Sequence, residues 1–393
     1  MTSCVPALIY VMTIAYKPAS QVSPEHVVVS THRGGVEVID NLADEWRNLC
    51  AETADDQPFY RPEWIRAHCR AFLFDPTLLL LTARINGKLC LVLPLVEERT
   101  CFAGVPVRKL RSPVNAHGGR FDGVRSSSPE SDAAVTAAWN FLNGSNSWEV
   151  LEFPYAPEQG TITRLIAEAR ASGCRTARVT ERPSPYIPVP TNLELLKQMP
   201  PNTKLRSQLR QSRHRLSKRG ALRLLRIATA DRDVLDRFYA LEASGWKGQQ
   251  RSAILSNPKT RQFYDEIAES AARFGYFSLY MLELNDQLLA GHFALTPASS
   301  CYSPKVAYNE TFKQFAPGHL IMAEILHDCA MRGIQRLDIT GSNEDWKMKW
   351  TNQTRAVSHY FVFKGAMGSL AHAVRFRLRP AVARQLHRKP KSA

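Results

Sequence analysis

The stretch YMLELNDQLLAGHFAL, residues Tyr280–Leu295, decides the fold that the sequence predicts. Two apolar runs flank the pair Asn285-Asp286, and Asn and Asp readily adopt the backbone conformation of a tight turn, so the stretch predicts a β-hairpin. A second stretch of the same design, TARINGKLCLVLPL, turns at Asn86-Gly87. The chain therefore places two hairpins at equivalent points of two successive halves.

The predicted helices and strands follow the same order in both halves. In the first half we predict a strand at 36–40, helices near 42–52 and 62–72, the hairpin at 77–96, a helix near 130–142, a strand at 149–153, a helix at 161–172 and a strand at 175–180. In the second half we predict a strand at 222–228, helices near 231–244 and 257–274, the hairpin, a strand at 300–307, a helix at 318–332, and strands at 336–339 and 356–363. This repeated order predicts an α/β fold, with a mixed sheet and helices in each of two tandem units.

The length of 393 residues suits two domains better than one. A proline-rich stretch between the halves, ERPSPYIPVP, is typical of a linker. The predicted boundaries are, in order, a disordered N-terminal segment at 1–34, a first unit at 35–183, a linker at 184–203, a second, catalytic unit at 204–365 and a basic tail at 366–393.

The basic residues are unevenly distributed along the chain. It has 51 Lys and Arg against 36 Asp and Glu, a formal charge of +15, yet residues 204–226 and 366–393 contain no acidic residue. The remainder of the chain is close to neutral. This distribution argues against a positive electrostatic field over the whole protein. It indicates two local contacts with anions, or two solvated faces, at the basic segments.

The first basic segment opens with KLRSQLRQSRHRLSKRG at 204–220. Leu205, Leu209, Ser212 and Leu216 recur with helical spacing, which predicts a helix docked on the second unit. No aromatic residue is interleaved for stacking on bases, so a docked helix with a solvated or anion-touching face is favoured over a nucleic-acid reader, and no DNA partner is expected. For the tail, peripheral contact with anionic lipid and disorder both stay open.

The cysteines and the missing motifs restrict the class of protein. Eight cysteines are scattered without a CxxC pair, as in a cytoplasmic protein with unpaired thiols. The apolar opening CVPALIYVMTIAY is too short to cross a bilayer, so we expect a cytoplasmic protein, with peripheral contact to the inner face of the membrane as an option. P-loop, dinucleotide-binding, zinc-protease and nucleophile-elbow motifs do not occur, and the eleven histidines lack ligand spacing, so no metal is expected.

One candidate site lies in VAYNETFKQFAPGHLIMAEILHDCAMRG, residues 306–333. A strand ends near Tyr308, and after a short loop Pro317-Gly318 open a helix whose apolar body would pack on the sheet. Free backbone N–H groups and the helix dipole make such a start suitable for a pyrophosphate. A plain strand–loop–helix unit is the alternative.

A second candidate site lies in LDITGSNEDWKMKW, residues 337–350. A strand carrying Asp338 runs into Gly341, and the polar residues after the glycine can cap a short helix that carries Lys347. An Asp at the end of a strand, before a glycine turn, suits a site at the carboxyl edge of a sheet. In the alternative, Asp338 is a helix cap and the lysines are solvated.

Four further residues lie in or near candidate sites. The loop ASGWKGQQ at 243–250 places Trp246 and Lys247 between two glycines after a helix, which favours contact with a ligand; a tryptophan tucked under the loop is the alternative. His292 and His319 are the only histidines near candidate sites. A lone strand histidine such as His292 is more often a satisfied core residue.

Four stretches together resemble the CelD/BcsL-type acyltransferases of the GNAT superfamily, which are related to the FemAB-like transferases. They are LEASGWKG, FYDEIAESAARFGYFSLYMLELNDQLLAGHFAL, KVAYNETFKQFAPGHLIMAEILHDCAMRG and LDITGSNEDWKMKW, and this resemblance spans roughly residues 200–365. DQPFYRPEW and LVLPLVEE resemble the N-terminal half of the same proteins. The resemblance implies two GNAT-like units that transfer an acyl group from a thioester, normally acyl-CoA, to an amine on a sugar or peptide, in exopolysaccharide or cell-envelope synthesis.

The resemblance, joined to the chemistry of acyl transfer, assigns expected roles to the candidate residues. The helix start would bind the pyrophosphate of acyl-CoA through Ala316, Pro317, Gly318, His319 and Leu320. Lys347 would stabilise the oxyanion or the anionic donor. Asp338 or Glu310 would act as the base or orient the amine, and Tyr308 would be the acid that protonates the leaving sulfur. The acceptor would be contacted by Trp246, Lys247 and His292.

The sequence at the helix start leaves the donor open. The general GNAT pattern there is Gln/Arg-x-x-Gly-x-Gly/Ala, whereas this chain has FAPGHL, the proline–glycine form of the subfamily. FemAB-like relatives use aminoacyl-tRNA as donor. An aminoacyl-tRNA-dependent transferase is therefore the alternative enzyme, and a non-catalytic scaffold of a polysaccharide-synthesis complex is the alternative outside enzymes.

Overall fold

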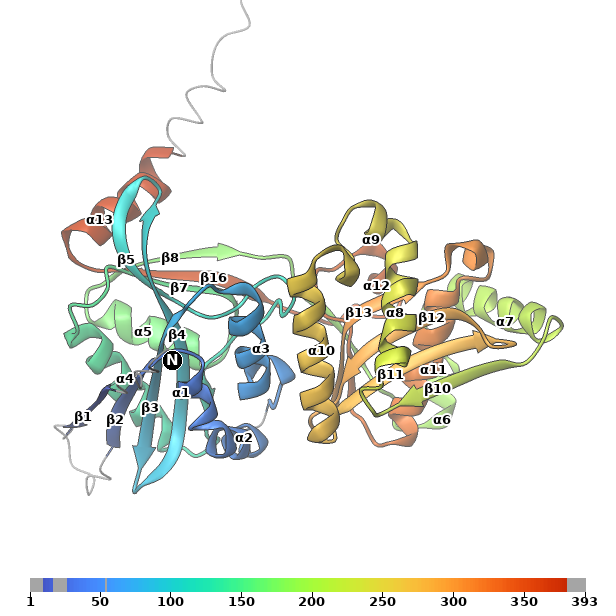
Figure 1. The fold of residues 1–393 in the computed structure, drawn as a ribbon, viewed down its shortest axis with the longest axis horizontal. Coiled ribbons are helices and arrows are strands. Elements are labelled where there is room, and N and C mark those ends of the chain that lie inside the picture. The colour runs from blue at the N-terminus through green and yellow to red at the C-terminus, as the bar shows by residue number, and fades with distance from the viewer. Residues whose placement is uncertain (1–9, 17–26, 54, 380–393) are drawn as a thin grey trace, which may run out of the picture.

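The computed structural model describes residues 10–16, 27–53 and 55–379, whose strands form two sheets that lie side by side (Figure 1). The larger sheet has the order β1 (Tyr10–Tyr16), β2 (Val27–Gly34), β3 (Thr77–Ile85), β4 (Lys88–Phe102), β5 (Val105–Arg111), β7 (Val150–Pro157), β16 (Val357–Phe363) and β8 (Arg175–Thr180), with β6 (Val124–Arg125) paired to β4. The smaller sheet has the order β10 (Leu222–Ile227), β11 (Phe277–Leu284), β12 (Gln287–Leu295), β13 (Ser300–Tyr308), β14 (Arg336–Asp338), β9 (Ser184–Pro188) and β15 (Thr354–Arg355). Both sheets mix parallel and antiparallel pairs, so the predicted mixed α/β fold is confirmed.

Helices flank both sheets (Figure 1). In the first half these are α1 (Glu37–Asp40), α2 (Ala43–Glu52), the 3-10 turn η1 (Pro58–Tyr60), α3 (Pro62–Phe72), α4 (Ser131–Gly144) and α5 (Thr161–Ala171). In the second half they are α6 (Leu193–Lys197), α7 (Thr203–Ser217), α8 (Arg232–Ser244), α9 (Trp246–Gln249), η2 (Ile254–Ser256), α10 (Pro258–Arg273), η3 (Glu310–Phe315), α11 (Pro317–Met331), α12 (Asp345–Met348), α13 (Gly365–Ala373) and the π-helical turn η4 (Val374–Leu378).

Both predicted hairpins, β3–β4 and β11–β12, are confirmed. The turn residues Asn86 and Gly87 have φ angles of 50° and 82°, and Asn285 and Asp286 have φ angles of 47° and 67°. Positive φ at both central residues is the geometry that matches the twist of the flanking strands. The local turn chemistry is therefore sufficient to locate these two hairpins.

The two halves exchange strands, which the sequence analysis did not predict. Part of the expected linker at 184–203 is strand β9, which pairs with β14 and β15 in the smaller sheet. The final strand β16, expected in the second unit, lies between β7 and β8 in the larger sheet (Figure 1). The prolines of β9 led us to predict a linker where the chain forms a strand. Local sequence patterns do not indicate which sheet a strand joins, because its partners are distant in sequence.

Three local predictions in the first half are wrong. Residues 37–40 of the expected strand form the one-turn helix α1 instead, in which the Asn41 N–H donates to the Glu37 carbonyl at 3.2 Å. The first strands are instead β1 and β2, inside the segment 1–34 that we expected to be disordered; residues 1–9 and 17–26 of it lie outside the described part. The second strand of the first hairpin runs beyond its predicted end at residue 96, to Phe102, and the chain then returns as β5.

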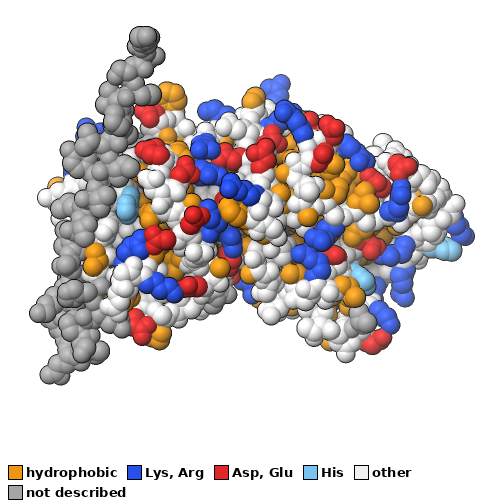
Figure 2. Space-filling model, turned by 60° about the horizontal axis from the view of Figure 1, so that its bottom comes forward, with side chains coloured by type: hydrophobic (Ala, Val, Ile, Leu, Met, Phe, Trp, Pro, Cys, Tyr) orange, Lys and Arg blue, Asp and Glu red, His pale blue; other side chains and the backbone are white. Residues whose placement is uncertain are grey.

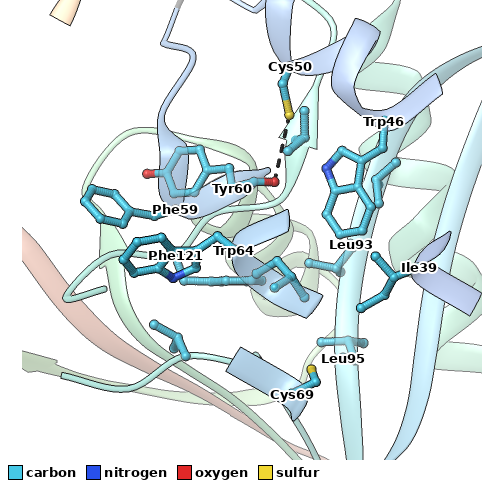
Figure 3. Packing of buried hydrophobic residues seen from close by; sticks show 14 of the residues in the cluster. Ile39, Trp46, Cys50, Phe59, Tyr60, Trp64, Cys69, Leu93, Leu95 and Phe121 are labelled. Carbon is cyan, nitrogen blue, oxygen red and sulfur yellow. Dashed lines mark hydrogen bonds between the residues drawn. The ribbon is translucent and has the colours of Figure 1, made fainter. Parts of the chain in front are cut away.

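One apolar core continues from the first half of the chain into the second. Figure 3 shows its part in the first half, where aromatic side chains from α2, η1 and α3 pack on β4. Trp64 of α3 packs edge-on against Phe263 of α10, with ring centroids 4.9 Å apart, and Phe59 packs edge-on against Tyr302 of β13 at 5.5 Å. The two halves therefore share an apolar interface that fixes their relative placement.

Both basic segments contain helices. The buried residues of α7 are Leu205, Leu209, Ser212 and Leu216, so its predicted docking stripe is confirmed. The tail begins with α13 and η4, and residues 380–393 lie outside the described part. Figure 2 shows acidic and basic side chains interspersed over the body of the protein. Within residues 10–16, 27–53 and 55–379, no helix has the length and apolar content needed to span a bilayer.

Candidate active site

The strands β13 and β14 separate in the middle of the smaller sheet. They pair in parallel over only three residues each, Ser300–Tyr302 with Arg336–Asp338. β13 then continues to Tyr308 beside β12, while the chain leaves β14 after Asp338. Among the described strands, none pairs with the free edge of β13 beyond this point. The opening begins at the carboxyl end of β14 and runs along the second half of β13; the carboxyl end of a parallel strand is a common position for a ligand.

A tight turn after β14 forms one wall of this opening. Thr340 and Gly341 have left-handed backbones, with φ angles of 51° and 64°. The Asp338 carboxylate accepts a hydrogen bond from the Thr340 N–H at 2.9 Å, and the Thr340 hydroxyl donates to the Ser303 carbonyl of β13 at 3.2 Å. A Cβ at Gly341 would lie 3.1 Å from Lys347 Nζ, so glycine here leaves room for the lysine.

Lys347 of α12 is buried against this turn. Its Nζ donates to the Thr340 carbonyl at 2.8 Å and to the Ser342 carbonyl at 3.1 Å, and lies 3.9 Å from the Glu344 carboxylate. Only 6% of the residue is exposed. Burial lowers the pKa of its ammonium, although Glu344 and Asp338 act in the opposite direction. An ammonium has three donors, so one is left for a substrate atom.

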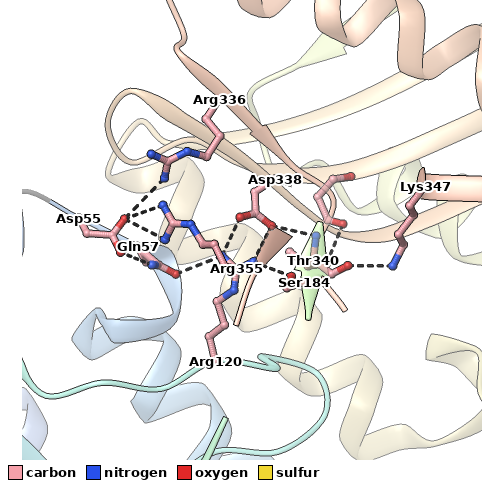
Figure 4. A network of polar contacts seen from close by, with 10 residues as sticks. Asp55, Gln57, Arg120, Ser184, Arg336, Asp338, Thr340, Lys347 and Arg355 are labelled. Carbon is pink, nitrogen blue, oxygen red and sulfur yellow. Dashed lines mark hydrogen bonds and ion pairs between the residues drawn. The ribbon is translucent and has the colours of Figure 1, made fainter. Parts of the chain in front are cut away.

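The carboxylate of Asp338 is hydrogen-bonded to a residue from the other half of the chain. Its two oxygens accept hydrogen bonds from the Arg120 guanidinium at 2.7 and 2.9 Å, in addition to the bond from Thr340 (Figure 4). Asp338 is fully buried, and Arg120 is 3% exposed. A carboxylate held in this way cannot approach an amine, so its contacts disfavour the base role that we expected and indicate a structural role.

On the other side of the opening is a cluster of one buried acid and two half-buried lysines. Lys247 Nζ donates to the Val306 carbonyl of β13 at 2.6 Å and to Glu242 Oε1 at 3.0 Å. Lys305 Nζ lies 3.5 Å from the same Glu242 oxygen, and the second oxygen accepts the Ile254 N–H at 2.8 Å. Burial lowers the pKa of the Lys305 ammonium; Lys247 adds to this, and Glu242 opposes it.

Trp246 and Glu310 are in contact on this side of the opening, and Tyr308 lies against the start of α11. The Trp246 N–H donates to Glu310 Oε1 at 2.9 Å, so Glu310 caps α9, and the indole of Trp246 is 47% exposed. The predicted loop at 243–250 therefore contains the short helix α9. Tyr308 is 37% exposed, and a Cβ at Gly318 would lie 3.5 Å from its ring. Exposed Trp246 and Tyr308 are accessible to a substrate, while Lys247 is largely committed to β13.

The expected donor site, the start of α11, is tightly built. Ala316 has a φ of 50° and its carbonyl accepts the N–H groups of His319 and Leu320, both at 3.0 Å. His319 Nδ1 accepts the Trp350 indole N–H at 2.9 Å, and burial, followed by Lys349, lowers its pKa to about 4. Leu320 is buried in the core. These residues offer mainly backbone and steric contacts to a donor, with Pro317 and Gly318 at the first turn.

His292 is a core residue, as the alternative in the sequence analysis held. It is 2% exposed, and its Nδ1 is 2.9 Å from the Ser303 hydroxyl. Burial, followed by Lys247, lowers its pKa to about 3, so the ring is neutral at physiological pH. Its burial disfavours the acceptor contact that we expected. Among the described residues, no group of three or more His, Cys, Asp or Glu side chains is placed to hold a metal ion.

The basic helix α7 flanks the start of α11. The guanidinium carbons of Arg215 and Arg219 each lie 4.8 Å from the centroid of the Phe315 ring, and Phe315 directly precedes Ala316. Arg213 forms an ion pair with Glu324 of α11. The basic segment is therefore positioned beside the expected donor site, where positive charge suits an anionic donor.

Sequence reasoning missed three residues of this region: Arg120, Glu242 and Lys305. Lys305 carried a signal, because a lysine inside an apolar strand that ends at a candidate site needs a buried acid nearby. Arg120 and Glu242 carried none, since their partners come from elements distant in sequence.

Comparisons with known proteins find one matching family model and several similar folds. Residues 203–348 match the family model described as Acetyltransferase (GNAT) domain. No curated protein sequence matches the chain. Among solved structures, FemX has a TM-score of 0.58 at 12% identity, covering 85% of this chain and 98% of its own.

Two further structures have a similar fold. The C-terminal domain of a putative lysylphosphatidylglycerol synthetase from Agrobacterium fabrum has a TM-score of 0.51 at 10% identity, covering 88% of this chain and 96% of its own. A conserved protein of unknown function from Bacteroides thetaiotaomicron has a TM-score of 0.50 at 11% identity, covering 82% and 97%. Residues 203–348 therefore resemble a GNAT acetyltransferase domain, and the chain has a mixed α/β fold like those of these structures.

Proposed function

We propose that the protein is an N-acyltransferase that moves an acyl group from acyl-CoA to an amine on a sugar or peptide, in exopolysaccharide or cell-envelope synthesis. The observation that carries the proposal is the buried ammonium of Lys347 at the opening between β13 and β14, inside the segment that matches a GNAT domain. The finer identification as a CelD/BcsL-type enzyme remains part of the proposal.

The chemistry needs few residue types. The amine nitrogen attacks the carbonyl carbon of the thioester, the C–S bond breaks, an amide forms, and the thiol leaves with a proton. Lys347 would stabilise the oxyanion, because its remaining donor and its charge act where water is excluded. Glu310, whose second oxygen has no described partner, would orient the amine and take the proton that its nitrogen loses, and Tyr308 would supply the proton that the leaving sulfur gains. Exposed Trp246 would contact the acceptor.

The donor would lie along the free edge of β13 with its pyrophosphate at the start of α11. The backbone at Pro317 and Gly318 allows close approach, and Arg215 of α7 and Arg219, just after α7, add positive charge beside it. Binding of acyl-CoA there is the step that the first experiment tests.

A CoA thioester is expected to raise the unfolding temperature of the protein. A donor at a hundred times its dissociation constant adds about 2.7 kcal/mol to stability, which thermal unfolding against a panel of thioesters and free CoA detects easily. A stabilisation that depends on acyl length would identify the donor class. Binding of neither CoA nor any thioester by the folded protein would contradict the acyl-CoA proposal.

The rate of acyl transfer is expected to fall on the alkaline side, because Lys347 must be charged to stabilise the oxyanion. Burial lowers its pKa, so this charge is lost at a lower pH than for a hydrated lysine. Lys347→Arg, whose guanidinium stays protonated, should remove the alkaline fall even if its rate is low. The pH dependence of kcat/KM checks this. A fall that persists in Lys347→Arg and disappears in Tyr308→Phe would assign it to the tyrosine instead.

An aminoacyl-tRNA donor is the second candidate, favoured by the basic face of α7 beside α11 and by the similarity to FemX. Salt-sensitive binding of charged tRNA, with no stabilisation by thioesters, would support it. A scaffold would bind neither donor.

Peripheral contact with anionic lipid stays a proposal for the tail, where Arg375, Arg377 and Leu378 are exposed.

A further inference from the structure

We propose that Arg120 of the first half is a positioning residue for Lys347 in the second half, so that the candidate active site is complete only when the two halves are docked. This inference rests on the proposed role of Lys347. It concerns a residue outside the segment that matches the GNAT family model, which spans 203–348.

The first step is the contact between Arg120 and Asp338, which are 218 positions apart in the chain. Arg120 lies in the loop between β5 and β6, and Asp338 ends β14. The guanidinium forms two parallel bonds to the carboxylate, at 2.7 and 2.9 Å, and also donates to the Ser184 hydroxyl of the exchanged strand β9 at 2.6 Å (Figure 4). The side chains of Arg120 and Asp338 are 4% and 0% exposed. Such a paired, buried contact has one geometry, because the planar guanidinium matches the carboxylate.

The second step leads from Asp338 to the lysine. Asp338 Oδ1, which accepts a bond from Arg120, also accepts the N–H of Thr340. Thr340 has a φ of 51°, a conformation that a β-branched residue adopts only under external constraint. The carbonyl of this same residue accepts the Lys347 ammonium at 2.8 Å. The orientation of the lysine therefore depends on a turn that the Arg120–Asp338 pair holds in place.

A second ion pair in the first half provides a matched comparison. Arg61 binds Asp56 through two bonds of 3.0 and 2.5 Å, and both residues are buried. Neither residue has a described contact with the turn at 338–342. Loss of Arg61 tests what a buried ion pair contributes to stability, while loss of Arg120 tests stability and the position of Lys347 together.

Two measurements that need no donor test the proposal: the titration of the Lys347 side chain by NMR and the hydrogen exchange of the Thr340 amide. In Arg120→Lys, which keeps the charge but loses the two parallel bonds, we expect faster exchange at Thr340. We also expect the pKa of Lys347 to rise toward its ordinary value, because the turn loosens and water enters. Glu344, Asp338 and Lys247 are the charged groups that face Lys347. In Arg61→Lys both quantities should match the unchanged protein.

Activity supplies the third readout once a donor is identified. A misplaced catalytic group commonly lowers a rate by about 10- to 100-fold, so kcat of Arg120→Lys should fall by this factor while KM for the donor changes little. If Arg120→Lys does not fold, Arg120→Met combined with Asp338→Asn leaves no unpaired buried charge and should still show faster exchange at Thr340. Unchanged exchange and unchanged Lys347 titration in a folded Arg120 variant would overturn the proposal. Failure of every thioester as a substrate would leave these two readouts intact and count only against the proposed function.

Discussion

Replacing Lys347 by methionine is expected to lower the rate of acyl transfer by about 10²- to 10³-fold, the usual loss when one stabilising donor is removed from an oxyanion site. Methionine is close to lysine in length and fills the same buried volume, but it has neither charge nor donors. The Thr340 and Ser342 carbonyls lose their partner, and the oxyanion loses its cation. Since the buried ammonium also carries a desolvation cost, we expect the variant to stay folded.

The measurement is the release of free CoA from the thioester that stabilises the protein most. Lys259→Met in α10, where the lysine is exposed, is the matched control and should keep the original rate. Thermal unfolding of each variant separates a catalytic loss from a folding loss. Full activity in a folded Lys347→Met protein would remove Lys347 from the mechanism.

Separate expression of the two halves, cut between β8 and β9, is expected to abolish folding of the first half. In the intact chain, β16 forms antiparallel pairs with both β7 and β8, so the first half alone has a missing strand inside its sheet. The second half keeps β9 but exposes the apolar surface that packs on α3, and Asp338 loses Arg120. An incomplete sheet with two open edges tends to aggregate.

Solubility and cooperative thermal unfolding measure this result. Co-expression of both halves should restore a folded complex, because every strand is then available. As a control, the full chain is folded first and then cleaved at an engineered site between β8 and β9; its halves should stay associated. A first half that unfolds alone as cooperatively as the intact protein would contradict the importance of β16.

The sequence predicted the parts of the fold that are encoded locally. Asn86-Gly87 and Asn285-Asp286 specify turns through their own backbone preferences, and the stripe from Leu205 to Leu216 specifies the buried face of α7. The exchange of β9 and β16 was not predicted, because strand propensity says which residues extend but not which distant strand they pair with.

The candidate site also has a part that is encoded locally and a part that depends on residues distant in sequence. Gly341 and Lys347 belong to one short stretch, and their proximity could be anticipated from it. Asp338 belongs to the same stretch, but its partner Arg120 comes from an irregular loop of the other half. Without that partner the carboxylate resembled a base; with it, both oxygens are occupied. The role of a buried charged residue can be assigned only when its counterion is known.

The position of β16 in the larger sheet has a consequence for the order of events during synthesis. The strands β7 and β8 have been synthesised once residue 180 is added, but the strand between them begins only at residue 357. At about 5–20 residues per second, the nascent first half waits roughly 10–35 s for its missing strand. During this interval two neighbouring chains on one messenger can insert each other's β16, so translation speed and chaperone access would decide the yield of monomer.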